Sequence, residues 1–154
     1  MGEKREHYAS VVLDGKIYAM CGHNGAGSPD TVEVYDPQAN SWQGVASMPH
    51  HLCDHAAAVM GGKIYVTGGS SQGSSVNSAY VYDPQADAWT QLASMGTARK
   101  AHASAAVGGK LYTFGGRDAS GRVSPAEAYD PASDSWAQVT SLTSARCGLV
   151  AAAL

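Results

Sequence analysis

Short apolar stretches alternate with turn-forming dipeptides along the chain, as expected for consecutive β-strands. In the middle of the sequence, a small apolar run at 55–60 precedes a Gly-Gly pair and a β-branched, aromatic run at 63–67. The alternating run at 78–83 ends at Asp-Pro, a dipeptide that starts turns, and a fourth run covers 88–94. No stretch keeps the apolar period of a helix. The pattern therefore predicts a unit of four β-strands and no helix.

This four-strand unit occurs three times with a period of 47 residues. Tyr-Asp-Pro followed by Trp recurs in VYDPQANSW, VYDPQADAW and AYDPASDSW, and the stretches GKIYAMCG, GKIYVTGG and GKLYTFGG keep the same spacing. A period of this length with a Gly-Gly pair is typical of propeller blades. The predicted fold class is all-β, a β-propeller segment with three four-stranded antiparallel blades over 7–47, 54–94 and 101–141. Because Tyr, Trp and Gly recur in every copy, we expect them to be structural and the aromatic rings to pack between blades.

The C-terminal residues 146–154 align in phase with 99–107 and with 5–13, so they predict one extra inner strand in the single segment 1–154. Closed propellers have about four to eight blades, so three blades leave apolar faces exposed at both ends. Two arrangements remain open. The chain is half of a six-bladed ring within a larger domain, or two chains close one ring as a homodimer, in which the extra strand would compete with 7–13 for one place. We expect the isolated chain to self-associate.

Gly-Gly, Tyr-Asp-Pro and Trp in this phase resemble the kelch repeat, and the resemblance covers nearly the whole chain. The C-terminal stretch LTSARCGLVAAAL is similar to the closing strand of BTB-kelch adaptor propellers. Two departures are Cys21, in place of the first Gly of its pair, and Leu52, in place of a recurring Arg. The resemblance implies a protein-protein interaction module like the substrate-recognition propeller of a cullin-RING ubiquitin ligase adaptor. The alternatives are a structural or actin-associated kelch scaffold, a designed propeller, and a kelch-fold enzyme such as an oxidase or a sugar epimerase.

The candidate binding face follows from strand direction. In an antiparallel blade, the connection from the second to the third strand and the connection to the next blade share one end of the sheet. These segments vary between copies, for example at 23–30, 70–77 and 117–124, whereas the turns at the other end are regular. Binding residues concentrate on loops held by a rigid scaffold. We therefore expect a peptide to bind at this end.

In the adaptors that the chain resembles, arginines in the phase of Arg5, Arg99 and Arg146 line a central pocket that holds acidic peptides. Guanidinium groups suit carboxylates, and a solvated or structural arginine is the alternative. The residues after the Gly pairs fall where the same family places further pocket residues. The predicted ligand-binding residues are Arg5, His23, His51, Cys53, Asp54, Ser70, Arg99, Lys100, Arg117 and Arg146. The predicted partner is a protein or an acidic peptide.

The stretch MPHHLCDHAAAV concentrates residue types that bind metals. Neighbouring side chains on an extended strand point to opposite sides, so these groups cannot all converge on one ion. His55 also recurs in phase as His102, which indicates a structural role. No copper ligand set, phosphate-binding Gly loop or nucleophile elbow can be assembled from the sequence. We therefore predict no metal, no cofactor and no enzymatic activity.

Composition narrows the partners. The 154 residues carry 10 Lys and Arg against 13 Asp and Glu, a net charge of −3, and this balance argues against nucleic acid. No apolar run of membrane-spanning length occurs, and the N-terminus lacks an apolar signal core. The three cysteines are few and their number is odd, which argues against a disulfide framework. Together these features predict a cytoplasmic protein without membrane or nucleic-acid partners.

Overall fold

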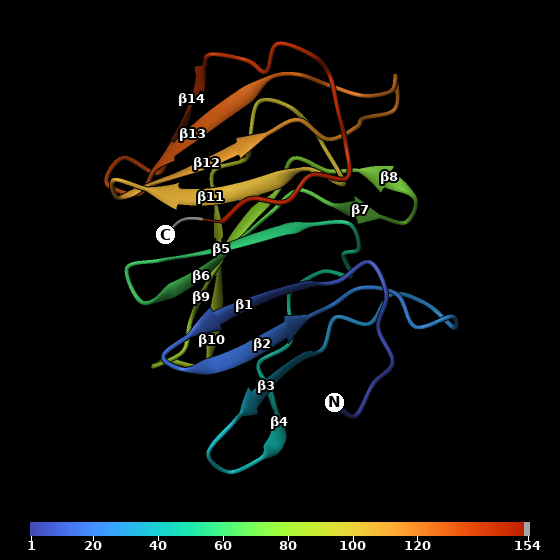
Figure 1. The fold of residues 1–154 in the computed structure, drawn as a ribbon, viewed down its shortest axis with the longest axis vertical. Coiled ribbons are helices and arrows are strands. Elements are labelled where there is room, and N and C mark those ends of the chain that lie inside the picture. Colours follow the sequence, from blue (N-terminus) through green and yellow to red (C-terminus); the bar gives the residue numbers. More distant parts are fainter. Residues whose placement is uncertain (153–154) are drawn as a thin grey trace.

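Each repeat forms one four-stranded antiparallel sheet in the computed structural model, which describes residues 1–152 (Figure 1). The predicted all-β fold is confirmed. The strands of blade 1 are β1 (Ala9–Leu13), β2 (Lys16–Met20), β3 (Val32–Asp36) and β4 (Ser41–Val45). The strands of blade 2 are β5 (Ala56–Met60), β6 (Lys63–Thr67), β9 (Ala79–Asp83) and β10 (Ala88–Leu92). The strands of blade 3 are β11 (Ala103–Val107), β12 (Lys110–Phe114), β13 (Ala126–Asp130) and β14 (Ser135–Val139).

The strands of each blade follow chain order across the sheet, from an inner strand to an outer one. The inner strand β5 lies between the inner strands β1 and β11 (Figure 1). A small additional hairpin, β7 (Ser70–Ser71) with β8 (Ser74–Ser75), extends the connection between β6 and β9 and was not predicted. The described part of the chain has no helix long and apolar enough to cross a membrane.

The first hairpin of each blade turns through two residues with positive φ. Asp14 and Gly15 have φ values of 51° and 72°, and Gly61 and Gly62 have 59° and 72°. Positive φ at both central residues is the type I′ geometry, whose twist matches that of the flanking strands. The Asp-Gly and Gly-Gly dipeptides therefore fix the register of the inner two strands, as the sequence pattern predicts.

The Gly pair at the end of the second strand allows the next blade to approach closely. Gly68 has a φ of 54°, and a Cβ atom there would lie 2.4 Å from the carbonyl oxygen of Arg99. The N–H of Gly69 donates a hydrogen bond of 2.9 Å to the same oxygen. In blade 1, Cys21 takes the corresponding place with a φ of 51° and a fully buried side chain. The departure at Cys21 therefore keeps the backbone conformation of the repeat.

The repeated Trp and Asp join consecutive blades by hydrogen bonds, and the Trp ring reaches the preceding blade as predicted. Trp89 Nε1 donates to the carbonyl oxygen of Ala46 at 2.8 Å, and the N–H of Ala46 donates to Asp87 Oδ1 at 2.8 Å. The Tyr82 hydroxyl donates to the same carboxylate at 2.7 Å. The junction between blades 2 and 3 repeats this set with Trp136, Ala93, Asp134 and Tyr129. Two hydrogen bonds therefore fasten each of blades 2 and 3 to the blade before it, and the Tyr hydroxyl holds the Asp carboxylate in place from within the same blade.

Apolar side chains fill the space between the blades. The rings of Tyr18 and Tyr82 meet between blades 1 and 2 with centroids 6.0 Å apart, inside the larger of two buried clusters. Tyr65 and Tyr129 meet in the same way between blades 2 and 3, at 6.2 Å. The two junctions are therefore built alike in their apolar contacts as well as in their hydrogen bonds.

The prediction of an extra inner strand at 146–154 is wrong for the part that the structure describes. Residues 146–152 run beside β11 as irregular chain, and residues 153–154 lie outside the described residues (Figure 1). The N–H of Gly148 donates to the carbonyl oxygen of Ala101 at 2.8 Å, which anchors the start of this segment. An inner strand needs the second strand of its own blade as a partner, and the described residues contain none for this segment.

Candidate ligand-binding face

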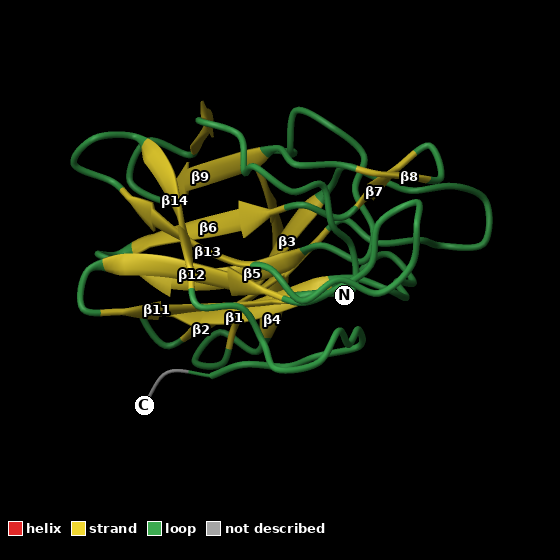
Figure 2. Cartoon of the chain, turned by 90° about the horizontal axis from the view of Figure 1, so that it is seen from above, coloured by secondary structure: helices red, strands yellow, loops and turns green. Residues whose placement is uncertain are grey.

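The connections that carry the predicted binding residues meet at one end of the sheets. Figure 2 shows the β7–β8 hairpin and the N-terminal end of the chain together on this side, with the short hairpin turns opposite. We call this end the loop face. It comprises the connections 21–31, 68–78 and 115–125 within blades and the connections 46–55 and 93–102 between blades.

In every blade a short antiparallel bridge joins the segment before the inner strand to the connection after the second strand. The bridged pairs are Glu6–His23, Cys53–Ser70 and Lys100–Arg117. In all three pairs the two residues exchange backbone hydrogen bonds, with lengths between 2.7 and 3.1 Å. The structure therefore brings together in pairs the predicted residues that precede the inner strands and those that follow the Gly pairs.

Arg99 is buried inside its blade, where its guanidinium is held by protein groups. Its side chain is fully buried, and its guanidinium donates to Gly115 O at 2.8 Å, Pro125 O at 2.7 Å and Glu127 Oε1 at 2.8 Å. Glu127 also accepts two backbone N–H groups from the connection that carries Arg99. The predicted ligand contact at Arg99 is therefore corrected, because the ion pair and the surrounding chain close the guanidinium off from the surface.

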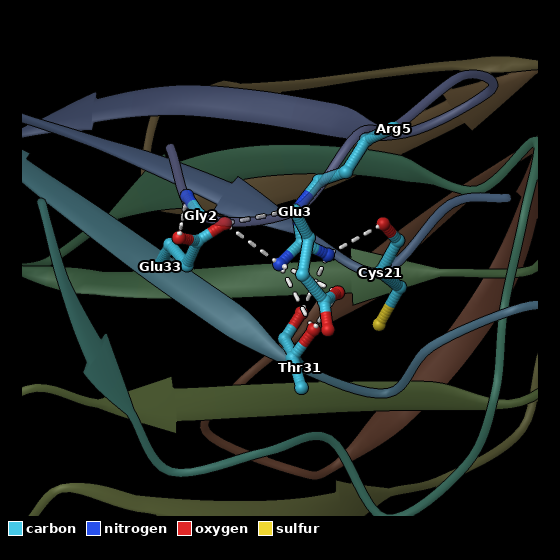
Figure 3. A network of polar contacts seen from close by, with 6 residues as sticks. All are labelled: Gly2, Glu3, Arg5, Cys21, Thr31 and Glu33. Carbon is cyan, nitrogen blue, oxygen red and sulfur yellow. Dashed lines mark hydrogen bonds and ion pairs between the residues drawn. The ribbon is translucent and has the colours of Figure 1, made fainter. Parts of the chain in front are cut away.

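Arg5 repeats this arrangement in blade 1 (Figure 3). Its side chain is fully buried, and Nη1 donates to Cys21 O at 2.8 Å and to Thr31 O at 3.0 Å. Nη2 donates to Thr31 Oγ1 at 2.9 Å and to Glu33 Oε2 at 3.0 Å. Burial raises the pKa of Glu33, but hydrogen bonds from the Gly2 N–H and from Arg5 outweigh it and hold that pKa below its usual value. The predicted ligand contact at Arg5 is corrected for the same reason.

Blade 2 replaces this ion pair with uncharged side chains. In blades 1 and 3 the Glu follows its Arg by 28 residues, and the same spacing separates Leu52 from Tyr80. Leu52 and Tyr80 are both buried, and the ring of His50 lies 5.8 Å from the ring of Tyr80. The departure at Leu52 is thus matched by a second one. The joint change of Arg to Leu and of Glu to Tyr is a sequence signal that these arginines pair with Glu33 and Glu127, two residues that the sequence-based prediction of the site did not include.

Arg146 shares the phase of the buried arginines but is exposed. Its Nη2 donates to the hydroxyl of Ser144, two residues earlier in the chain. No blade covers it, since the described residues place no sheet after blade 3. Of the three arginines that share this phase, Arg146 is the one that is exposed.

The side chains of 50–55 point to different places. His51 is exposed, the Cys53 sulfur lies 3.8 Å from a carbonyl oxygen of the neighbouring connection, and Asp54 Oδ1 forms a hydrogen bond of 2.8 Å with His7 Nδ1. Within residues 1–152, no three His, Cys, Asp or Glu side chains gather as a metal site would require. The stretch therefore contributes separate residues to the loop face.

Two buried histidines stand where inner strands begin. His102 Nε2 forms a hydrogen bond of 2.9 Å with Thr67 Oγ1, whereas neither ring nitrogen of His55 has a partner among the described residues. Burial lowers the pKa of His55 to about 4. Burial, together with the Arg99 charge, lowers the pKa of His102 to about 3. Both rings are therefore neutral at pH 7 and serve packing.

A groove of about 370 Å³ opens on the loop face between the β7–β8 hairpin and the connection after β12. It is lined by Gly73, Ser74, Ser75, Ala98, Lys100, Arg117, Asp118, Ala119 and Ser120. Three of the predicted residues are at or next to this groove, namely Ser70, Lys100 and Arg117.

The groove presents two cationic side chains. Lys100 Nζ lies 3.2 Å from Gly73 O and 3.4 Å from Ser70 Oγ, so it leans toward the β7–β8 hairpin, while Arg117 is exposed. The Asp118 carboxylate accepts backbone N–H groups of its own loop at 2.7 and 3.1 Å. Both bonds go to Oδ1, and the groove sets the two cations Lys100 and Arg117 against this one carboxylate, so its charged lining is net positive.

The kelch motif matches residues 4–49, 51–96 and 98–143. The chain belongs to the kelch-repeat family. Each matched segment of this kelch chain starts shortly before an inner strand and ends after the fourth strand of the same blade.

Similar curated proteins carry kelch repeats in their names. They include Kelch-like protein 26 of Danio rerio (41% identical over 56 residues), Kelch-like protein 7 of Rattus norvegicus (43% over 49 residues) and an F-box/kelch-repeat protein of Arabidopsis thaliana (40% over 50 residues). These matches cover 36%, 32% and 32% of this kelch chain and 9%, 8% and 13% of the relatives. The repeats and these relatives support a protein-interaction propeller, and the matched part is a small fraction of each relative.

A solved structure described as "Structure of YjhT" has the same fold. It superimposes on this kelch chain with a TM-score of 0.81 at 20% sequence identity. The match covers 93% of this chain and 54% of that one. The three kelch blades therefore correspond to about half of a longer propeller chain.

Proposed function

We propose that this kelch chain is a protein-interaction module whose loop face binds an acidic protein segment in the groove between blades 2 and 3. The observation that carries the proposal is the pair of cationic side chains, Lys100 and Arg117, at a groove lined by a single carboxylate, that of Asp118. Lys and Arg form charge-assisted hydrogen bonds with carboxylates. Arg99 is buried, so we assign the contacts with an acidic peptide to Lys100 and Arg117 in its place. His23, His51, Cys53, Asp54 and Arg146 would form the surrounding rim.

We propose further that the binding serves substrate recognition, as in the ubiquitin ligase adaptors that the chain resembles. The support is the family membership and the relatives named as kelch-like or F-box/kelch-repeat proteins. The role is binding without catalysis, in a reducing cytoplasm. Cys21, Cys53 and Cys147 are all free thiols, and burial raises the pKa of Cys21 to about 12, which suits a packing role.

A displayed random-peptide library tests the ligand class. Selection on the purified chain is expected to return sequences rich in Asp and Glu, because the groove supplies donors and positive charge. Selected peptides with no acidic enrichment would contradict the proposal and favour a scaffold that recognises its partner by shape.

Charge removal then tests the site. Arg117→Ala and Lys100→Ala are each expected to weaken a selected peptide by roughly 3- to 30-fold in fluorescence anisotropy, and added salt should weaken it further. Lys16→Ala is the matched control, because Lys16 is an exposed lysine at the opposite end of blade 1, paired with Asp36 at 3.0 Å. Equal losses in the control and the groove variants would place the ligand elsewhere.

A further inference from the structure

We propose that two copies of this chain close one ring, independently of the ligand proposed above. The front face of a blade is the side that contacts the following blade, and the back face contacts the preceding one. In the proposed dimer, the front face of blade 3 in each copy packs on the back face of blade 1 in the other. The two junctions of such a two-fold ring are identical.

The back face of blade 1 has the exposure expected where a neighbour is missing. Ile64 and Leu111 are fully buried on the back faces of blades 2 and 3. Ile17 occupies the same phase in blade 1 and is 37% exposed. Tyr35 is likewise only partly buried, although it shares the phase of the buried Tyr82. Blade 1 thus carries an apolar back face that nothing in the described chain covers.

The front face of blade 3 shows the complementary exposure. Leu13, on the front face of blade 1, is 4% exposed because blade 2 packs on it. Val107 holds the same phase in blade 3 and is 60% exposed, and Val139 at the end of β14 is 39% exposed. The chain contains two complete junctions between blades. The back face of blade 1 and the front face of blade 3 are the two halves of a third junction, and both are uncovered in the described chain.

The hydrogen-bonding groups of the junction are also left over at both ends. In the repeat, Trp42 corresponds to Trp89 and Asn40 to Asp87, the two residues that bond to the backbone of the preceding blade. Thr140 corresponds to Ala46, the residue whose backbone they bind. Asn40 Oδ1 accepts the Tyr35 hydroxyl at 2.8 Å, as the junction aspartates accept theirs. Within residues 1–152, Trp42 Nε1 and the backbone groups of Thr140 have no hydrogen-bond partner.

A second copy of the chain matches what these ends lack. It offers the back face of a blade 1 to Thr140 and the front face of a blade 3 to Trp42. Tyr112, in phase with Tyr18 and Tyr65, would then meet Tyr35 of the partner as the internal pairs meet at 6.0 and 6.2 Å. The chain corresponds to 54% of a solved kelch chain, so two copies supply about one whole ring.

The C-terminal segment must yield in the ring. The N–H of Gly116 donates to Arg146 O, just as the N–H of Gly69 donates to Arg99 O, so 146–149 lie where the first residues of a following blade would lie. In the dimer, residues 5–8 of the partner take this place. The described part of the segment forms no β-ladder, so the exchange gives up only a few hydrogen bonds, which the partner replaces in kind.

Sedimentation velocity of the full chain tests the proposal. We expect a species of twice 15.9 kDa that dissociates on dilution and does not grow into larger assemblies. A monomer that persists at high micromolar concentration would overturn the proposal, and so would an open series of oligomers, because neither is a closed two-fold ring.

Two matched pairs of variants locate the interface. Trp42→Phe removes an N–H that has no partner within the chain, so it should leave monomer stability unchanged and raise the dimer Kd roughly 5- to 100-fold, with one bond lost at each of two junctions. Its control, Trp89→Phe, breaks the internal bond to Ala46 and should lower the melting temperature instead. Thr140→Pro should weaken the dimer by removing an N–H that Thr140→Ala keeps. An unchanged dimer Kd in both Trp42→Phe and Thr140→Pro would overturn the proposed interface.

Discussion

Arg99 and Glu127 form a buried ion pair in blade 3 whose place in blade 2 is taken by Leu52 and Tyr80. A buried pair gains electrostatic energy but loses the hydration of two ions, so its net contribution to stability is small. Removal of one partner is different, because it leaves an uncompensated charge in the interior. Blade 2 shows that the same site accepts an uncharged pair. The contributions of the charged pair and of the uncharged pair to the free energy of unfolding can therefore be compared within one protein.

Arg99→Ala is predicted to lower the free energy of unfolding by about 3–5 kcal/mol, because Glu127 would remain buried without its partner. The double variant Arg99→Leu with Glu127→Tyr copies blade 2 and should recover most of this loss. Urea denaturation of the three proteins measures both effects. A double variant that is no more stable than the single one would show that the ion pair is not the reason for the loss.

Acid sensitivity is predicted from the buried histidines. The unfolded chain protonates a histidine near pH 6.5, whereas burial lowers the pKa of His55 to about 4 and that of His102 to about 3. Between about pH 6.5 and 4 the unfolded state therefore binds more protons, and the free energy of unfolding falls as the pH falls. Each histidine should account for a loss of about 2 kcal/mol between pH 7 and pH 5.

His55→Phe tests this linkage, because His55 has no hydrogen-bond partner to lose among the described residues. The variant should keep its stability at pH 7 and lose about 2 kcal/mol less than the parent on going to pH 5. Urea denaturation across this pH range measures the difference. Identical pH dependence in parent and variant would rule out His55 as a source of acid sensitivity.

The strands were predictable because their signals are local. Alternating apolar residues and dipeptides such as Gly61-Gly62 fix strands and hairpins within a few residues. The β7–β8 hairpin lies in a Ser- and Gly-rich stretch without apolar alternation, so no local signal announced it. The strand expected at 146–154 failed for another reason: repeat phase shows where a strand would begin, but a ladder also needs a partner strand.

The candidate site was predictable only in part. Position in the repeat located the loop face and the groove residues Lys100 and Arg117, because loops between regular strands recur at fixed offsets. The same phase misplaced Arg5 and Arg99, since it does not tell whether a side chain turns outward. A carboxylate 28 residues later decides that direction. For Arg146 the described chain supplies no such partner, and the side chain is exposed.

At the level of the blade, we predict that replacing Gly68, which follows β6, destabilises the protein more than replacing Gly61 in the turn between β5 and β6. Gly68→Ala places a methyl group against the Arg99 carbonyl oxygen, so the next blade must shift, and we expect a loss of about 2 kcal/mol or more. Gly61→Ala is the matched control: its φ is 59°, but no atom lies within 4 Å of the added Cβ, so only about 1 kcal/mol should be lost. Thermal unfolding compares the two, and equal losses would show that backbone conformation alone requires Gly68.

On the scale of the whole molecule, the open ends of blades 1 and 3 and the loop face are surfaces of different character. The open ends of blades 1 and 3 are apolar and repeat internal junctions, so they suit another blade of the same kind. The loop face is variable and places Lys100 and Arg117 at a groove of about 370 Å³, although the chain as a whole carries a net charge of −3. This contrast supports an acidic partner at the groove and not at the open ends.

The most direct test of this account is to map a selected acidic peptide on the isotope-labelled chain by NMR chemical-shift perturbation. We predict that the shifted amides cluster at 70–75, 98–100 and 117–120, around the groove. Shifts confined to the hairpin turns at 13–16, 60–63 and 107–110 would contradict it, because those turns lie at the opposite end of the blades.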